Sequence, residues 1–536
     1  MTAPIEAADV RVSVTGEALT GPRDATLAQA REAGVAAAVV AKDPGLWGEE
    51  ARSEASIRLG WLDLPTSSRE LLPRLAALRA ELLADGLDRV VLAGMGGSSL
   101  APEVICDTAG AELTVLDTTD PGQVRAALAD RLSRTVVVVS SKSGGTIETD
   151  SHRRAFAQAF ADAGVTDVGR HFVAVTDPGS SLEQTAKDEG FRAVFLADPN
   201  VGGRYSALTA FGLVPSALAG VDVTALLDEA AKLSPSLAAD ESPALQLGAA
   251  LGGAGREGRD KVVLAGAGSP ISGFGDWAEQ LLAESTGKQG KGLLPVVVGS
   301  VDSPGTSGGD DIHLVRLGPA GGQAPSTSVS GSLGGQFLAW EYATAVAGWA
   351  LGINPFDQPN VTESKENTAK ILDSGPPKER PALVDGAVEV YADEALVAGA
   401  SGLADVLTAL IAAVPADGYL AVMAYLDRHA EQAAAGVRDL LAARTERAVT
   451  FGWAPRFLHS TGQYHKGGPQ VGAFLQITGV VAEDLPIPGR EYTFGTLQAA
   501  QAAGDRQALT QRDRPLVHLH LTDRAAGVAQ LLEATQ

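Results

Sequence analysis

The sequence predicts an α/β protein with two doubly wound parallel-sheet domains behind a helical N-terminal segment. Short Val- and Leu-rich runs alternate with Ala-rich stretches, and runs that are apolar throughout indicate parallel strands covered on both faces. The motif V-V-L-A-G-x-G occurs at 90–96 and again at 262–268. A separation of about 170 residues is far longer than a solenoid repeat, so the repeat indicates two related domains.

Composition agrees with more than one packed core. The chain has 536 residues, of which 45% are hydrophobic and 20% are charged. Its 42 Lys and Arg residues face 65 Asp and Glu residues, a net charge of −23, so we expect neither nucleic acid nor a membrane as partner. The single cysteine, Cys106, excludes an internal disulfide framework and favours a cytoplasmic protein. The sequence shows neither a signal-peptide pattern nor an apolar run of roughly 18 residues.

The predicted domains follow from the alternation of strand-like and helix-like segments and from the repeated motif. We expect a helical segment at 1–85, a first domain at 86–233, a linker at 234–243, a second domain at 244–500 and a C-terminal segment at 501–536. Strands of the first domain are predicted at 89–93, 113–116, 135–140, 172–176 and 193–196. Strands of the second are predicted at 293–298, 312–317, 419–424, 448–451 and 473–478, and long loops at 300–310 and 318–335.

Two polar loops follow predicted strands of the first domain. The loop G-M-G-G-S-S at 94–99 brings backbone N–H groups to a helix N-terminus, which suits a phosphate. The loop S-S-K-S-G-G-T-I-E-T at 140–149 adds hydroxyls and an ammonium at the same edge of the sheet. A tight turn without a ligand and a helix cap remain the alternatives for these loops.

Two further segments carry charged groups. Arg204, in V-G-G-R-Y-S, is always charged and can stabilise an oxyanion, although it can equally be a surface residue paired with a carboxylate. Gln280 and Glu284 lie four residues apart, so on a helix they share one face. Glu284 can then act as a general base, whereas the alternative is an ordinary polar face.

Histidines gather near the end of the chain. His459, His465 and Lys466 fall in H-S-T-G-Q-Y-H-K-G-G-P beside glycines, which suits acid–base chemistry, with an exposed turn as the alternative. His518 and His520 share one face of a predicted strand, but no third ligand is evident in the sequence. We therefore expect no metal site.

These motifs together resemble the glucose-6-phosphate isomerase (phosphoglucose isomerase) family. G-x-G-G-S, S-K-x-x-x-T-x-E-T, V-G-G-R-Y-S and Q-x-x-x-E-S-x-G-K appear in the family's order over about residues 85–300. The resemblance implies two sugar-isomerase (SIS) domains, a homodimer and no cofactor. It implies interconversion of glucose 6-phosphate and fructose 6-phosphate through a cis-enediolate, in glycolysis and gluconeogenesis.

The resemblance also assigns roles. It places the substrate phosphate on the first two loops, namely on Gly97, Ser98, Ser141, Lys142, Ser143 and Thr146. It makes Glu284 the base, Gln280 a substrate-orienting residue and Arg204 the stabiliser of the enediolate. Lys466 resembles the family's late active-site lysine.

One position departs from the family pattern. Relatives open the sugar ring with a histidine after a G-Q pair, whereas here Phe337 follows Gly335-Gln336. His459 and His465 are the candidates to replace it, with His459 favoured. This segment resembles the isomerase part of bacterial transaldolase–isomerase fusions.

Two other functions are compatible with part of these motifs. The first is another SIS-fold isomerase, such as a dual glucose/mannose 6-phosphate isomerase, although those are shorter and carry threonine near Gln280. The second is a non-catalytic phosphosugar-binding protein. It would need the phosphate cradle that the loops at 94–99 and 140–149 form, but neither Glu284 nor Arg204.

Overall fold

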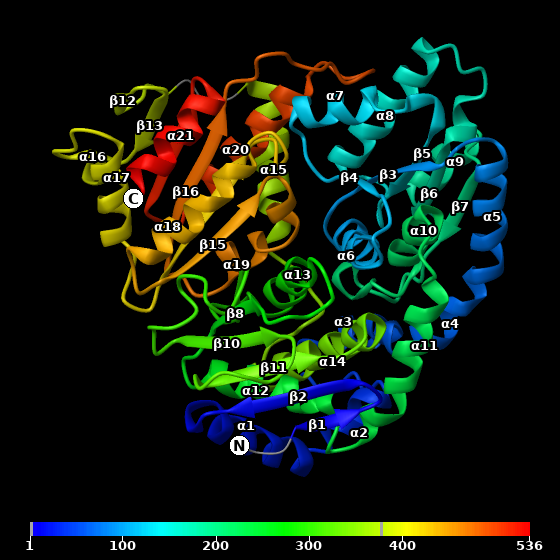
Figure 1. Ribbon diagram of the computed structural model, residues 1–536, viewed down its shortest axis with the longest axis vertical. Coiled ribbons are helices and arrows are strands. Elements are labelled where there is room, and N and C mark those ends of the chain that lie inside the picture. The colour runs from blue at the N-terminus through cyan, green and yellow to red at the C-terminus, as the bar shows by residue number, and fades with distance from the viewer. Residues whose placement is uncertain (1–3, 376–378) are drawn as a thin grey trace.

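The computed structural model describes residues 4–375 and 379–536, arranged as three sheet-containing units (Figure 1). The α/β class with parallel sheets is confirmed. Each sheet is covered by helices, and the three units surround helix α13 (Phe274–Thr286). No helix among the described residues is long and apolar enough to cross a bilayer.

The first unit is a parallel sheet of five strands in the order β4-β3-β5-β6-β7. The strands are β3 (Arg89–Gly94), β4 (Thr114–Leu116), β5 (Thr135–Ser140), β6 (Phe172–Thr176) and β7 (Ala193–Leu196). One face is covered by α5 (Leu72–Ala84), α6 (Leu100–Ala109) and α10 (Ala210–Ala219). The other is covered by α7 (Pro121–Ala129), α8 (Ile147–Asp162) and α9 (Ser181–Asp188). Every residue of β3, β5 and β6 is buried, as a parallel sheet covered on both faces requires.

The second unit has the strand order β1-β2-β11-β10-β8-β9. The strands are β1 (Ile5–Ala7), β2 (Val10–Thr15), β8 (Lys261–Gly266), β9 (Leu294–Val298), β10 (Ile312–Leu317) and β11 (Ser326–Ser330). Strands β8 to β11 are parallel, whereas β2 runs antiparallel to β11. One face packs on α1 (Glu17–Glu32), α12 (Pro243–Arg256) and α14 (Leu333–Leu351). The repeated motif forms β3 and β8, which are interior strands of their sheets.

The third unit has the order β12-β13-β17-β16-β14-β15. The strands are β12 (Leu383–Asp385), β13 (Val388–Ala392), β14 (Tyr419–Tyr425), β15 (Ala448–Trp453), β16 (Gly472–Gly479) and β17 (Leu516–Leu521). One face carries α16 (Glu394–Val397), α17 (Leu403–Ala412), α18 (Val437–Ala443) and α21 (Arg524–Ala534). The other carries α19 (Gly462–Gly467) and α20 (Phe494–Thr510), with α15 (Val361–Ser374) beside α20.

The structure describes four further α-helices. They are α2 (Val35–Val40), α3 (Arg52–Arg58), α4 (Leu64–Ser67) and α11 (Val223–Leu233). Tyr419 and Met423 of β14 share one apolar cluster with Val263 of β8 and Val296 of β9, so the second and third units pack directly on each other.

The structure corrects three boundaries. Residues 5–15 form strands rather than part of a helical segment, because V-R-V-S-V-T alternates and pairs with β11; residues 1–3 of that segment lie outside the described residues. The expected second domain at 244–500 contains strands of two sheets, the second and the third. The expected segment at 501–536 is not separate, because α20 crosses residue 500 and β17 lies between β13 and β16.

Two local expectations were also wrong. The linker at 234–243 contains a short 3-10 helix at Ser234–Ala238 that packs inward, and Tyr342 donates a hydrogen bond to the Leu237 carbonyl. The loop expected at 318–335 contains β11, whose sequence S-T-S-V-S has too few apolar residues to be recognised as a strand.

Candidate functional site

The two polar loops lie at the carboxyl ends of β3 and β5, which are neighbours in the first sheet. Ser141 Oγ and Thr146 Oγ1 are 2.9 Å apart, and the Gly144 N–H donates to Ser141 Oγ at 3.2 Å. Thr146 precedes α8, but its side chain makes no capping hydrogen bond within the described chain. The two hydroxyls therefore face each other at the N-terminus of a 16-residue helix, where the helix dipole favours an anion.

The glycines of the first loop let it approach two other motifs closely. A Cβ on Gly97 would lie 1.9 Å from the Gly203 carbonyl oxygen, so no side chain fits there. Gly96 has φ +57°, and a Cβ on it would meet Gln280 Nε2 at 2.7 Å. Ser98, in the short 3-10 helix η3 (Gly96–Ser98), is half-buried beside them. The first loop thus packs against the turn that contains Arg204 and against Gln280 of α13.

Lys142 does not turn toward the hydroxyls. Its ammonium pairs with Asp177 at 2.6 Å. The predicted contribution of Lys142 to the cradle is not visible in this arrangement, whereas Ser143 does line a cavity with Thr146.

Arg204 and Glu284 meet at the centre of the molecule. Arg204 Nη1 lies 3.5 Å from Glu284 Oε2, and their side chains are only 2% and 8% exposed. The guanidinium also donates to Ser285 Oγ, to Gln358 Oε1 and to the carbonyls of Pro355 and Asp357. Burial raises the pKa of Glu284, and Arg204 opposes that rise. A buried carboxylate whose pKa is raised toward neutrality suits a general base.

Gln280 lies one turn before Glu284 on α13. Its Nε2 donates to the His459 carbonyl at 2.9 Å and lies 3.5 Å from Glu284 Oε1. Its buried Oε1 accepts no hydrogen bond from any described residue. That oxygen is free to accept one from a ligand hydroxyl.

His459 comes from the 3-10 helix η9 (Arg456–His459) of the third unit and reaches the first unit. Its Nε2 lies 3.1 Å from Glu148 Oε1 in the first turn of α8. Burial alone would raise the pKa of Glu148, but the neighbouring His459 brings it down to about 2. Glu148 is therefore ionised at neutral pH and can orient an imidazole.

His465 and Lys466 lie elsewhere. Tyr419 Oη and His465 Nδ1 are 2.9 Å apart, and burial lowers the pKa of His465 to about 3. Lys466 Nζ pairs with Asp505 at 2.7 Å, and both side chains are at most 3% exposed. The described lining of the cavity beside Thr146 does not include Lys466, and its role as an active-site lysine stays a prediction.

A cavity of about 260 Å³ lies beside the cradle and contains a different lysine. It is lined by Ser143, Thr146, Glu148, His459, Gln501 and Lys365, with Ile147, Leu372 and Leu458 as apolar walls. Lys365 of α15 is exposed. It was not predicted from the sequence, because it lies outside the four motifs and the histidine-rich segment. Glu148 belongs to the motif at 140–149, although no role was predicted for it from the sequence. Gln358 and Gln501 lie outside all of the motifs, so no sequence pattern pointed to them.

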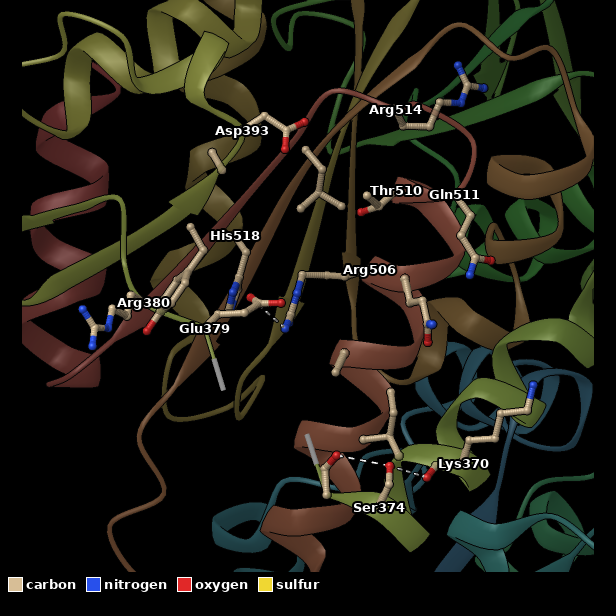
Figure 2. A pocket seen from close by; sticks show the side chains of 17 residues that line it. Lys370, Ser374, Glu379, Arg380, Asp393, Arg506, Thr510, Gln511, Arg514 and His518 are labelled. Carbon is tan, nitrogen blue, oxygen red and sulfur yellow. Dashed lines mark hydrogen bonds and ion pairs between the residues drawn. The ribbon is translucent and has the colours of Figure 1, made fainter. Parts of the chain in front are cut away.

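A larger cavity of about 880 Å³ lies within the third unit, between α15, α20, β13 and β17 (Figure 2). Arg506 and Glu379 face each other across it at 3.9 Å. Its described lining includes none of the predicted site residues except His518 of the histidine pair. His518 Nε2 and His520 Nδ1 each bond the Thr478 hydroxyl, and the described residues contain no group of three or more potential metal ligands.

The fold and the site together define an α/β protein with parallel sheets, in which hydroxyl-bearing loops follow two neighbouring strands and a buried carboxylate pairs with an arginine. Residues 82–240 match the family model described as phosphoglucose isomerase. The resemblance to glucose-6-phosphate isomerase is therefore confirmed, and the matched stretch contains both cradle loops and Arg204 but ends before Glu284.

Individual relatives agree with this match. A glucose-6-phosphate isomerase of Cyanothece is 35% identical over 238 residues, 42% of this chain and 44% of the relative. One from Streptococcus pyogenes is 28% identical over 389 residues, 59% of this chain and 86% of the relative. The chain thus spans less than half the length of the cyanobacterial relative.

Solved structures extend the likeness of the fold. A glucose-6-phosphate isomerase of Chlamydia trachomatis superposes with a TM-score of 0.53 at 18% identity, covering 69% of this chain and 90% of that one. A hypothetical protein of Thermus thermophilus superposes with a TM-score of 0.55 at 25% identity, covering 67% of this chain and 99% of that one.

Proposed function

We propose that this protein is an aldose–ketose isomerase that interconverts glucose 6-phosphate and fructose 6-phosphate in glycolysis and gluconeogenesis. The observation that carries the proposal is the buried Arg204–Glu284 pair, 3.5 Å apart. The first polar loop packs against the turn that holds Arg204 and against Gln280, one helical turn before Glu284. A binding protein needs the cradle, but it does not need a carboxylate of raised pKa beside an arginine.

The reaction uses these groups in sequence. Ser98, Ser141, Ser143, Thr146 and the start of α8 hold the phosphate. Glu284 removes the proton on C2 of the open-chain aldose, which leaves a cis-enediolate. Arg204 stabilises the negative charge on its oxygens. Glu284 then returns the proton to C1 while a hydroxyl proton passes from O2 to O1, so the sugar is isomerised without net oxidation.

Ring opening is assigned to His459. It lines the cavity beside the cradle. Ionised Glu148 accepts a hydrogen bond from its Nε2–H group, which leaves Nδ1 to exchange protons with the sugar. Gln280 orients a sugar hydroxyl through its unpaired Oε1. Lys365 replaces Lys466 as the lysine of the site, because it lines the same cavity as His459.

The direct test is a coupled assay of fructose 6-phosphate turnover with and without a chelator. We expect metal-independent turnover, and activity that is lost to chelation and restored by zinc contradicts this expectation. Mannose 6-phosphate in the same assay separates a dual isomerase from a specific one.

Glu284→Gln tests the base. The change keeps the volume of the side chain but removes the proton acceptor, so kcat is expected to fall by about 10²–10⁴-fold while sugar-phosphate binding changes little. A variant within about tenfold of wild type places the base elsewhere.

A cytoplasmic homodimer is the proposed working form. Cys106 is fully buried, and burial raises the pKa of its thiol to about 12, which fits a reduced and unreactive cysteine. The dimer is implied by the resemblance alone, and sedimentation equilibrium measures it.

A further inference from the structure

The third unit contributes a buried amide to the Glu148–His459 pair. Gln501 of α20 is 3% exposed, and its Nε2 donates to Glu148 Oε1 at 2.7 Å. The same oxygen receives His459 Nε2 at 3.1 Å. Glu148 Oε1 is therefore held from two sides by groups of the third unit.

The orientation of this amide is fixed by a second contact. Thr119 Oγ1, which is fully buried after β4 of the first unit, donates to Gln501 Oε1 at 2.7 Å. With Oε1 facing a hydroxyl donor, the NH₂ group must face the carboxylate. A flipped amide would place two acceptors, Oε1 and the Glu148 carboxylate, against each other.

From this geometry we infer that Gln501 is a positioning residue for ring opening. Gln501 acts through Glu148. It holds the carboxylate in the orientation in which Oε1 accepts a hydrogen bond from His459 Nε2–H, and Nδ1 of the imidazole is then left for the sugar. This inference rests on the proposed function of His459. Small misplacements of a proton-transfer group cost large factors in rate, which gives the amide a measurable effect.

Gln501→Leu keeps most of the side-chain volume and removes the donor. We expect kcat for cyclic fructose 6-phosphate to fall by about tenfold or more with KM nearly unchanged. The comparison substrate is fructose 6-phosphate methylated on O5, which cannot close a ring because O6 carries the phosphate. Its turnover should stay near wild type.

Gln498→Leu is the matched control. Gln498 lies one turn earlier on α20, is 5% exposed and places Nε2 3.5 Å from Asp120 of the first unit, so it sits at the same boundary without touching Glu148. It should leave both substrates unaffected. If the control variant slows the cyclic substrate as much as Gln501→Leu, the effect is one of docking and the inference fails.

Gln501→Glu provides a rescue. A carboxyl at this position can donate to Glu148 only when it is protonated, and two adjoining carboxylates raise the pKa of the pair. The ratio of its cyclic-substrate rate to that of wild type should therefore increase as pH falls from 8 to 6. A ratio that does not change with pH overturns the inference.

Other outcomes separate this inference from the proposed function. If Gln501→Leu raises KM at unchanged kcat, the amide binds substrate and does not position Glu148. If His459→Ala slows the cyclic substrate but Gln501→Leu does not, the role of Gln501 falls while the proposed function stands. If His459→Ala itself has no effect, the assignment of ring opening is wrong.

Discussion

His459 and His465 show how position alone separates two identical side chains. The first reaches across to Glu148 and is 15% exposed beside a cavity. The second is sealed against Tyr419, and burial lowers its pKa to about 3, so it remains neutral at pH 7. Of the two histidines, only His459 lines the cavity that Thr146 and Glu148 also line.

Alanine variants of the two histidines test this difference. His459→Ala should slow turnover of cyclic sugar phosphate by about 10²-fold, the lower end of the range for a general acid or base, and should spare the O5-methylated substrate. His465→Ala should mainly lower stability, because it leaves the buried Tyr419 hydroxyl without its imidazole. Steady-state kinetics and thermal melting separate the two effects, and near wild-type cyclic turnover by both variants excludes each histidine from ring opening.

The hydroxyl pair of the cradle should affect binding rather than chemistry. Ser141→Ala combined with Thr146→Ala is expected to raise KM with little change in kcat, because phosphate is bound alike in the ground and transition states. Ser151→Ala is the control, since its hydroxyl bonds the Ile147 carbonyl within α8. A fall in kcat at constant KM would show that the pair acts on the reacting carbons.

At the scale of elements, the short helix η9 decides where His459 points. Arg456, at its start, pairs with Asp117 at 2.7 Å and with Glu103 of α6 at 2.6 Å, and Asp117 is 2% exposed. Arg456 is largely buried, and these carboxylates hold the pKa of its guanidinium above its usual range despite that burial. The helix is thus anchored to the first unit although it belongs to the third.

Arg456→Met should release this anchor. Removal of one partner leaves Asp117 buried without its main cation, so unfolding free energy is expected to fall by about 3–5 kcal/mol. Arg490→Met is the control: Arg490 pairs with Asp150 across the same two units, but its side chain is 40% exposed, and an exposed pair contributes below about 1 kcal/mol. Urea unfolding measures both, and equal losses would mean that burial does not distinguish the two pairs.

At the scale of the whole molecule, the site lies where three units meet. α13 contacts α6 of the first unit, α14 of the second and α19 of the third. The folded chain buries several histidines in a neutral form: burial lowers the pKa of His152 to about 4, and those of His313 and His465 to about 3.

This burial predicts acid sensitivity. Between pH 6.5 and 4 each of these histidines is protonated in the unfolded chain but neutral in the folded one, so unfolding takes up protons. Each therefore lowers stability by up to about 1.4 kcal/mol per pH unit as pH falls. His313→Gln can keep a hydrogen bond to Thr327. In this variant the number of protons taken up on unfolding should fall by about one, so the slope of unfolding free energy against pH, measured by urea unfolding, becomes smaller. An unchanged slope would show that His313 titrates normally in the folded protein.

The α/β class, most strands and the closeness of the two polar loops could be predicted from the sequence. Strands 135–140, 172–176 and 312–317 coincide with β5, β6 and β10, because short segments rich in β-branched and apolar residues are recognised without tertiary context. The pairing of the two polar loops also followed from sequence, since the carboxyl ends of parallel strands meet at one edge of a sheet.

The division into three sheet-containing units, and the contacts between groups from distant segments, could not be predicted from the sequence. The separation of 244–536 into parts of two sheets, and the entry of residues 5–15 into one of them, depend on strand pairing over hundreds of residues. The position of Lys365 in the cavity that His459 lines, and the meeting of Glu148 with His459 and Gln501, have the same origin. Each depends on how α15, η9 and α20 pack against the first unit, and local sequence patterns do not encode such contacts.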